Sequence, residues 1–196
     1  MRVTKSIVLL IEDNDSFFRA LEINKAARSL RTNFEMVAVV PPNEFASNLM
    51  IRKDGHDFSS SLGDAGFVNT RVIFLSGAQV SPTLALWAGI DSAIGERVTV
   101  VFSPIFEIED WDRFWRNAEK LDAYFAYPNK DSTGRSAIQK ALALVLGVVY
   151  KFSTGNKLEN RPIALVDMNR EYINFLHKTH QPEISLRNSN LFSGFL

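Results

Sequence analysis

Short apolar runs recur along the chain, and between them apolar residues return at helical spacing. Residues 7–11 and 34–40 are short runs dominated by apolar, branched side chains, which predicts strands buried on both faces of a parallel sheet. The same criteria predict strands at residues 7–11, 34–40, 71–75, 98–102, 123–127 and 163–166. They predict helices from the turn at residues 12–15 to about residue 31, and at residues 43–50, 82–94, 107–121, 136–152 and 170–177.

The stretch SAIQKALALVLGVVYKF, residues 136–152, is the centre of the predicted fold. No polar residue occurs between positions 141 and 150, so a helix here is apolar all round and is expected to be buried. The stretch is too short to span a bilayer. We therefore interpret it as a central buried helix, with a parallel sheet before it and one returning strand after it. Strands that alternate with helices predict an α/β, Rossmann-like, doubly wound parallel sheet.

Single residues predict where some of these helices begin and end. The acidic turn at residues 12–15 is typical of a helix cap. Pro82 is expected at the start of the helix at residues 82–94, and Gly95 directly after it, where glycine commonly ends a helix.

Composition limits the domain count and the possible partners. The 196 residues are 46% hydrophobic and include 15 Phe, enough for one sizeable core; we expect a single domain at residues 1–180 and a tail at residues 181–196. Lys+Arg and Asp+Glu are both 22, and Cys is absent. The zero net charge argues against nucleic-acid or membrane-surface binding, and the lack of Cys excludes disulfides and thiolate metal sites.

The N-terminus has only five consecutive apolar residues, so we expect no signal peptide, no membrane span and a cytoplasmic location.

In a doubly wound sheet ligands bind beyond the carboxyl ends of the strands, so the loops after the strands are the places to search. None of them is a glycine-rich phosphate loop. The first loop carries Glu12, Asp13 and Asp15, three carboxylates that would repel a phosphate. A solvated helix cap is the simplest interpretation of Glu12 and Asp13.

The order of the segments resembles the nucleotide-binding domain of the tubulin/FtsZ family. RVIFLSG resembles the strand before the family's glycine-rich loop, LDAYFAYPNKDS the strand that closes in Ile-Pro-Asn, KALALVLGVVYKF the central helix, and RPIALVDMNREY the catalytic loop. The resemblance implies the family's N-terminal fold. It also implies nucleotide binding by Ser76, Gly77 and Asn129 where the site is retained, and catalysis by Asp167 and Glu171 where the protein is active.

The chain departs from this family at its phosphate loops. The first loop has no glycine, the second keeps one at Gly77, and Arg170 stands where the second catalytic acid is expected. We therefore expect a non-catalytic, tubulin-like or FtsZ-like structural protein, a pseudo-GTPase that acts through self-assembly or a protein partner, with no metal and no cofactor. A divergent GTPase that binds GTP or GDP is the first alternative.

A degenerate response-regulator receiver domain is the second alternative. IVLLIEDND resembles the start of such a domain, in which paired acids such as Glu12 and Asp13 hold Mg²⁺. However, Asp54, at the spacing of the phosphoacceptor, has no apolar strand before it, and no lysine precedes Pro104.

Overall fold

A computed structural model of the 196-residue chain describes residues 3–29, 33–43, 66–77, 80–102, 111–126 and 163–178. The described elements are, in chain order, β1 (Lys5–Leu10), α1 (Asn14–Ser29), β2 (Phe34–Val40), β3 (Thr70–Phe74), α4 (Pro82–Ser92), β4 (Arg97–Val101), α5 (Trp111–Ala118), β5 (Ala123–Ala126), β6 (Leu165–Asn169) and α7 (Arg170–Lys178).

Every described strand and helix lies where the hydrophobic pattern predicted one, within a few residues. The predicted helices at residues 43–50 and 136–152, and the predicted tail at residues 181–196, lie outside the described residues. The single-domain assignment for residues 1–180 stays a prediction.

The described strands form one six-stranded sheet in the order β3-β2-β1-β4-β6-β5. β1 pairs in parallel with β2 on one side and β4 on the other, and β3 extends the parallel part beyond β2. The general prediction of a Rossmann-like α/β sheet is thus confirmed.

The prediction that all strands run in parallel is wrong. β6 is inserted between β4 and β5 and runs antiparallel to both. The apolar pattern of β6 predicted its burial correctly, but burial does not encode direction. The connection from β5 to β6 covers residues 127–164, which is long enough to return the chain in either direction. Only the pairing partners decide between the two.

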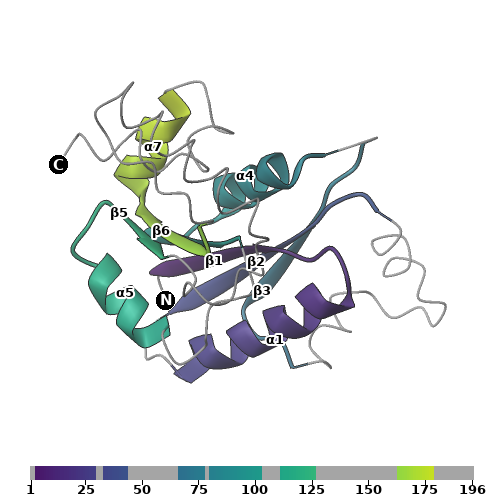
Figure 1. Ribbon diagram of the computed structural model, residues 1–196, viewed down its shortest axis with the longest axis horizontal. Helices are drawn as coiled ribbons and strands as arrows, with labels where there is room; N and C mark the ends of the chain where they lie inside the picture. The colour runs from purple at the N-terminus through teal and green to yellow at the C-terminus, as the bar shows by residue number, and fades with distance from the viewer. Residues whose placement is uncertain are drawn as a thin grey trace, which may run out of the picture.

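Helices cover both faces of the sheet (Figure 1). α1 and α5 lie on one face, where their apolar residues pack with Ile7 and Leu9 of β1. α4 and α7 lie on the other face and pack with Val8. Because successive strand residues point to opposite faces, β1 must be apolar at consecutive positions to be buried on both.

The two ends of α4 differ in how well the sequence predicted them. Ser81 caps the start, because its hydroxyl accepts a hydrogen bond from the Leu84 amide at 3.2 Å, and Pro82 follows as the first helical residue. At the other end the cap is Ala93, whose amide donates to the carbonyls of Gly89 and Ile90. Gly95 therefore does not end the helix in a left-handed conformation. It is required because a Cβ there would lie 2.6 Å from the backbone nitrogen of Ser6.

Gly89 sets the distance between α4 and the sheet, and it generates a stability prediction. A Cβ at this position would lie 2.4 Å from Val8 Cγ1 and 2.8 Å from Val39 Cγ2. Gly89→Ala should therefore lower the free energy of unfolding by about 1–3 kcal/mol through overpacking, although the same change in an exposed helix stabilises by roughly 0.5–1 kcal/mol. Urea denaturation measures the difference. Val8→Ala removes the nearest contact, so an equal cost of Gly89→Ala in that background would contradict this explanation.

Candidate functional site

The strand order reverses direction at β1. From β1 the chain builds outward through β2 to β3, and then crosses to the other side of β1 to form β4. In open α/β sheets such a reversal leaves a crevice outside the carboxyl ends of the two strands that flank it. A ligand site is therefore expected at the carboxyl ends of β1 and β4.

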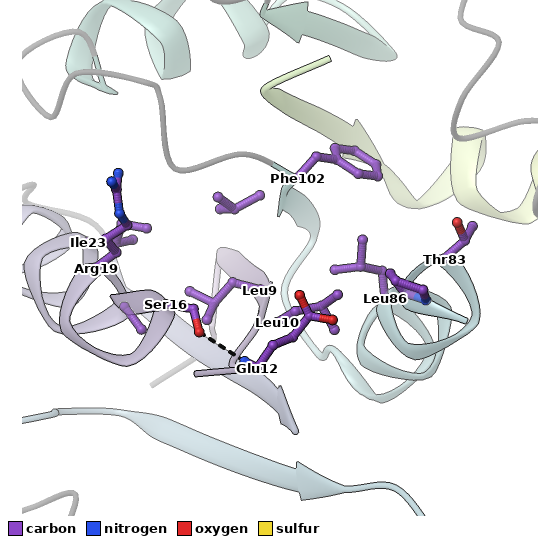
Figure 2. A pocket seen from close by; sticks show the side chains of 12 residues that line it. Leu9, Leu10, Glu12, Ser16, Arg19, Ile23, Thr83, Leu86 and Phe102 are labelled. Atoms are coloured by element: carbon purple, nitrogen blue, oxygen red, sulfur yellow. Dashed lines mark hydrogen bonds between the residues drawn. The ribbon is translucent and has the colours of Figure 1, made fainter. Parts of the chain in front are cut away.

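A pocket of about 260 Å³ lies at this reversal, between α1 and α4 (Figure 2). Most of its walls are apolar, with four polar side chains among them, a composition typical of small-molecule sites. The apolar residues are Leu9, Leu10, Ala20, Ile23, Pro82, Leu86, Val101 and Phe102; the polar ones are Glu12, Ser16, Arg19 and Thr83.

The acidic loop after β1 divides its carboxylates between different tasks. Asp13 caps α1, since its Oδ1 accepts a hydrogen bond from the Ser16 amide at 2.7 Å. This backbone hydrogen bond, together with one from the Ser16 hydroxyl, lowers the pKa of Asp13 below its usual value. Asp15 lies in the first turn of α1, where the helix dipole favours a negative charge. Of the three acids, Glu12 lines the pocket. The repulsion of a phosphate that was expected from three carboxylates therefore comes from one.

The polar residues of the pocket come from three pieces of chain. Glu12 extends from the loop after β1 toward the space between α1 and α4 in Figure 2, while Ser16 and Arg19 come from α1. Thr83, in the first turn of α4, is buried and supplies a hydroxyl group. The site thus offers a carboxylate, a guanidinium and the Thr83 hydroxyl over an apolar floor, while the Ser16 hydroxyl is bonded to Glu12 and Asp13.

Sequence reasoning found one side of this site and missed the other. The loop after β1 was selected because it follows a predicted strand, but Arg19 and Thr83 were not selected. Arg19 lies one turn after Ser16, on the same face of α1 as Ala20 and Ile23. That spacing was a usable signal, because residues three and four apart share a helix face.

Asp167, a predicted catalytic acid, is buried in the middle of β6. Its Oδ1 accepts a hydrogen bond from Arg97 Nε at 2.5 Å, and its Oδ2 accepts one from the Thr99 hydroxyl at 2.7 Å. Trp115 of α5 donates to the same Thr99 oxygen at 2.9 Å. Burial raises the pKa of Asp167 above its usual value, against the opposing effects of Thr99 and Arg97. The carboxylate therefore joins β4, β6 and, through Thr99, α5.

The other predicted site residues do not gather around Asp167. Glu171 is exposed in the first turn of α7. β6 is antiparallel to β4, and Asn169 at its end lies opposite Arg97 at the start of β4. Glu171 therefore lies near the amino ends of the parallel strands, whereas the pocket lies at their carboxyl ends. Ser76 and Gly77 are exposed after the edge strand β3 and do not line the pocket. Asn129 lies outside the described residues.

Within the described ranges, no three His, Cys, Asp or Glu side chains come close enough together to hold a metal ion. Among the helices that the structure describes, none has both the length and the apolar character needed to cross a bilayer.

Comparison with known proteins identifies a fold. No family model and no curated protein matches the sequence. Glucosyl-3-phosphoglycerate synthase from Mycobacterium tuberculosis, solved with phosphoglyceric acid, is similar in structure: it is 13% identical, with a TM-score of 0.52, over 86% of this chain and 57% of that chain. A mycobacterial protein is 13% identical, with a TM-score of 0.51, over 86% of this chain and 54% of its own.

A third similar structure comprises residues 1–349 of TarS from S. aureus, 17% identical with a TM-score of 0.46, over 69% of this chain and 38% of that one. This chain thus spans between 38% and 57% of the three structures. The first two likenesses establish a shared fold.

These findings correct the predicted relationship to tubulin and FtsZ. The chain shares its fold with the synthase rather than with that family, and its sheet contains an antiparallel strand between β4 and β5. Three predictions of function are therefore wrong: a tubulin-like pseudo-GTPase that acts by assembly, a divergent GTPase, and a receiver domain. The order of strands and helices misled because it is common to many doubly wound folds. The roles predicted for Asp167, Glu171, Ser76, Gly77 and Asn129 depended on that resemblance.

The raised pKa of Asp167 predicts a pH dependence of stability. The folded state keeps the Asp167 proton to a higher pH than the unfolded state does, so this group contributes stability that is fully present below the ordinary value of 3.8 and is lost as pH rises through the folded-state pKa. The variant Asp167→Asn lacks this contribution. We expect the free energy of unfolding of the wild type, minus that of the variant, to fall as pH rises from about 4 through the folded-state pKa of Asp167.

Urea denaturation of both proteins at several pH values measures this difference. A difference that grows with pH would show that the hydrogen bond from Arg97 outweighs the cost of burying the charge.

Proposed function

We propose that this chain is the nucleotide-sugar-binding part of a glycosyltransferase, and that the pocket between β1 and β4 holds the nucleotide. One observation carries the proposal. The described pocket lies at the point where the strand order reverses, in a fold shared with a glucosyl-3-phosphoglycerate synthase. Ligands of open α/β sheets bind at such points.

The chemistry of the pocket supports a nucleoside diphosphate sugar as the ligand. Apolar walls from Leu9, Leu86 and Phe102 suit the faces of a base. The Glu12 carboxylate is a hydrogen-bond acceptor for ribose or sugar hydroxyls, and the Arg19 guanidinium is a donor suited to a diphosphate. The volume of about 260 Å³ is at the small end for ligand sites, so the pocket takes one portion of the nucleotide sugar and the rest extends beyond it.

The proposed reaction is glycosyl transfer. The bond between the anomeric carbon and the diphosphate oxygen breaks, and the nucleoside diphosphate leaves with the bonding electrons. A new bond forms from the anomeric carbon to an acceptor hydroxyl oxygen, which loses its proton. That proton passes to a general base.

Isothermal titration calorimetry with uridine diphosphate and guanosine diphosphate tests the proposal. We expect one of the two to bind the wild type. Arg19→Gln removes the guanidinium from the pocket and should weaken that binding by about tenfold or more, the usual effect of losing a charge-assisted hydrogen bond. Lys25→Gln is the matched control, because Lys25 is an exposed cation of the same helix that does not line the pocket.

Two results would contradict the proposal. The first is that neither diphosphate, nor its glucose or mannose conjugate, binds the wild type. The second is that Arg19→Gln and Lys25→Gln weaken binding equally, which would indicate a general charge effect rather than a contact in the pocket.

A further inference from the structure

Glu12 is an exposed residue in a loop, yet both peptide groups that flank its Cα are held. On its amino side, the Glu12 N–H donates to the Ser16 hydroxyl oxygen at 2.9 Å, as the dashed line in Figure 2 shows. On its carboxyl side, the peptide group is held by two hydrogen bonds. The Asp13 N–H donates to the same Ser16 oxygen at 3.0 Å, and the Glu12 carbonyl accepts a hydrogen bond from the side-chain amide of Asn43, Nδ2 to O, at 3.0 Å.

Asn43 comes from a different part of the chain. It follows β2 and the two prolines at positions 41 and 42, and its side chain is half-buried. The hydrogen bond from Asn43 therefore ties the loop after β2 to the loop after β1. Ile11, just before Glu12, donates its amide to the Val39 carbonyl at 2.9 Å, so the pairing of these strands continues into their loops.

We infer that Asn43 is a positioning residue for ligand binding, which acts by holding the Glu12 backbone so that its carboxylate faces the pocket. This inference rests on the proposed function. A residue whose flanking peptide groups are both held has little freedom in φ and ψ, so the direction of its Cα–Cβ bond is set before the ligand arrives, and fewer side-chain conformations remain to be searched. Ordering a loop side chain only on binding costs affinity, and preorganisation avoids that cost.

The geometry separates this role from capping of α1. Asp13 and Ser16 serve the helix as well as the loop, so their substitution would disturb both. Asn43 belongs to neither α1 nor β2, and its bond to Glu12 crosses between loops. Replacing Asn43 therefore tests the position of Glu12 while the cap remains in place.

A double-mutant cycle tests the inference by calorimetry with uridine diphosphate, or with guanosine diphosphate if that binds the wild type more tightly. Asn43→Ala should weaken binding by about three- to tenfold. In the Glu12→Gln background, where the carboxylate is already lost, Asn43→Ala should have little further effect. Asn117→Ala is the matched control, because Asn117 is exposed on α5, away from the pocket, and affinity should not change.

A second measurement needs no ligand. Amide hydrogen exchange at Glu12 and Asp13, followed by NMR, should become several-fold faster in Asn43→Ala, while the melting midpoint stays close to that of the wild type. Unchanged exchange would show that Asn43 does not hold the loop, and would overturn the inference whether or not a nucleotide binds.

The remaining outcomes separate the two proposals. Equal effects of Asn43→Ala in the wild-type and Glu12→Gln backgrounds would overturn the role of Asn43 while leaving nucleotide binding intact. Absence of binding to the wild type would overturn the proposed function, and with it any role of Asn43 beyond anchoring the loop.

Discussion

The burial of β1 on both faces is the constraint on which the rest of the structure depends. The strand lies inside the sheet with parallel neighbours on either side, and its apolar residues alternate between the two helical layers. Neither layer is optional, because removing either would expose one half of the strand to water. The same position makes β1 the point where the strand order reverses. One requirement, a central strand covered on both sides, therefore produces both the core and the crevice at its carboxyl end.

Two charged residues that enter this core, Lys5 and Glu35, are paired across elements. Lys5, buried at the start of β1, lies 3.4 Å from Glu119 and over the ring of Trp115. Glu35 of β2 accepts hydrogen bonds from the Ser6 hydroxyl and the Ile94 amide, both at 2.6 Å. An unpaired charge in such a place would be very costly. These contacts therefore favour one register of the strands and one position of the loop after α4.

The proposed site combines apolar residues of the strands and helices, which form a rigid framework, with a polar residue from a loop. Leu9, Leu86 and Val101 belong to the framework, and their positions are set by packing. Glu12 comes from a loop, and its backbone is held by hydrogen bonds with Ser16 of α1 and with Asn43 of the loop after β2. A shared fold does not identify a reaction by itself. It is the placement of a carboxylate and a guanidinium over an apolar floor that gives the proposed nucleotide-sugar ligand its chemical basis.

The sequence by itself determined where the described strands and helices lie, because burial on one or two faces imposes a local periodicity of apolar positions. It determined the start of α4 for the same reason, since Pro82 acts on its own helix. Only the tertiary structure decided that β6 is antiparallel, that Gly95 makes room for the backbone at Ser6, and that Asp167 pairs with Arg97. It alone also brought Glu12, Arg19 and Thr83 around one pocket. Strand direction and convergence join residues far apart along the chain, and no local pattern of apolar and polar positions records such contacts.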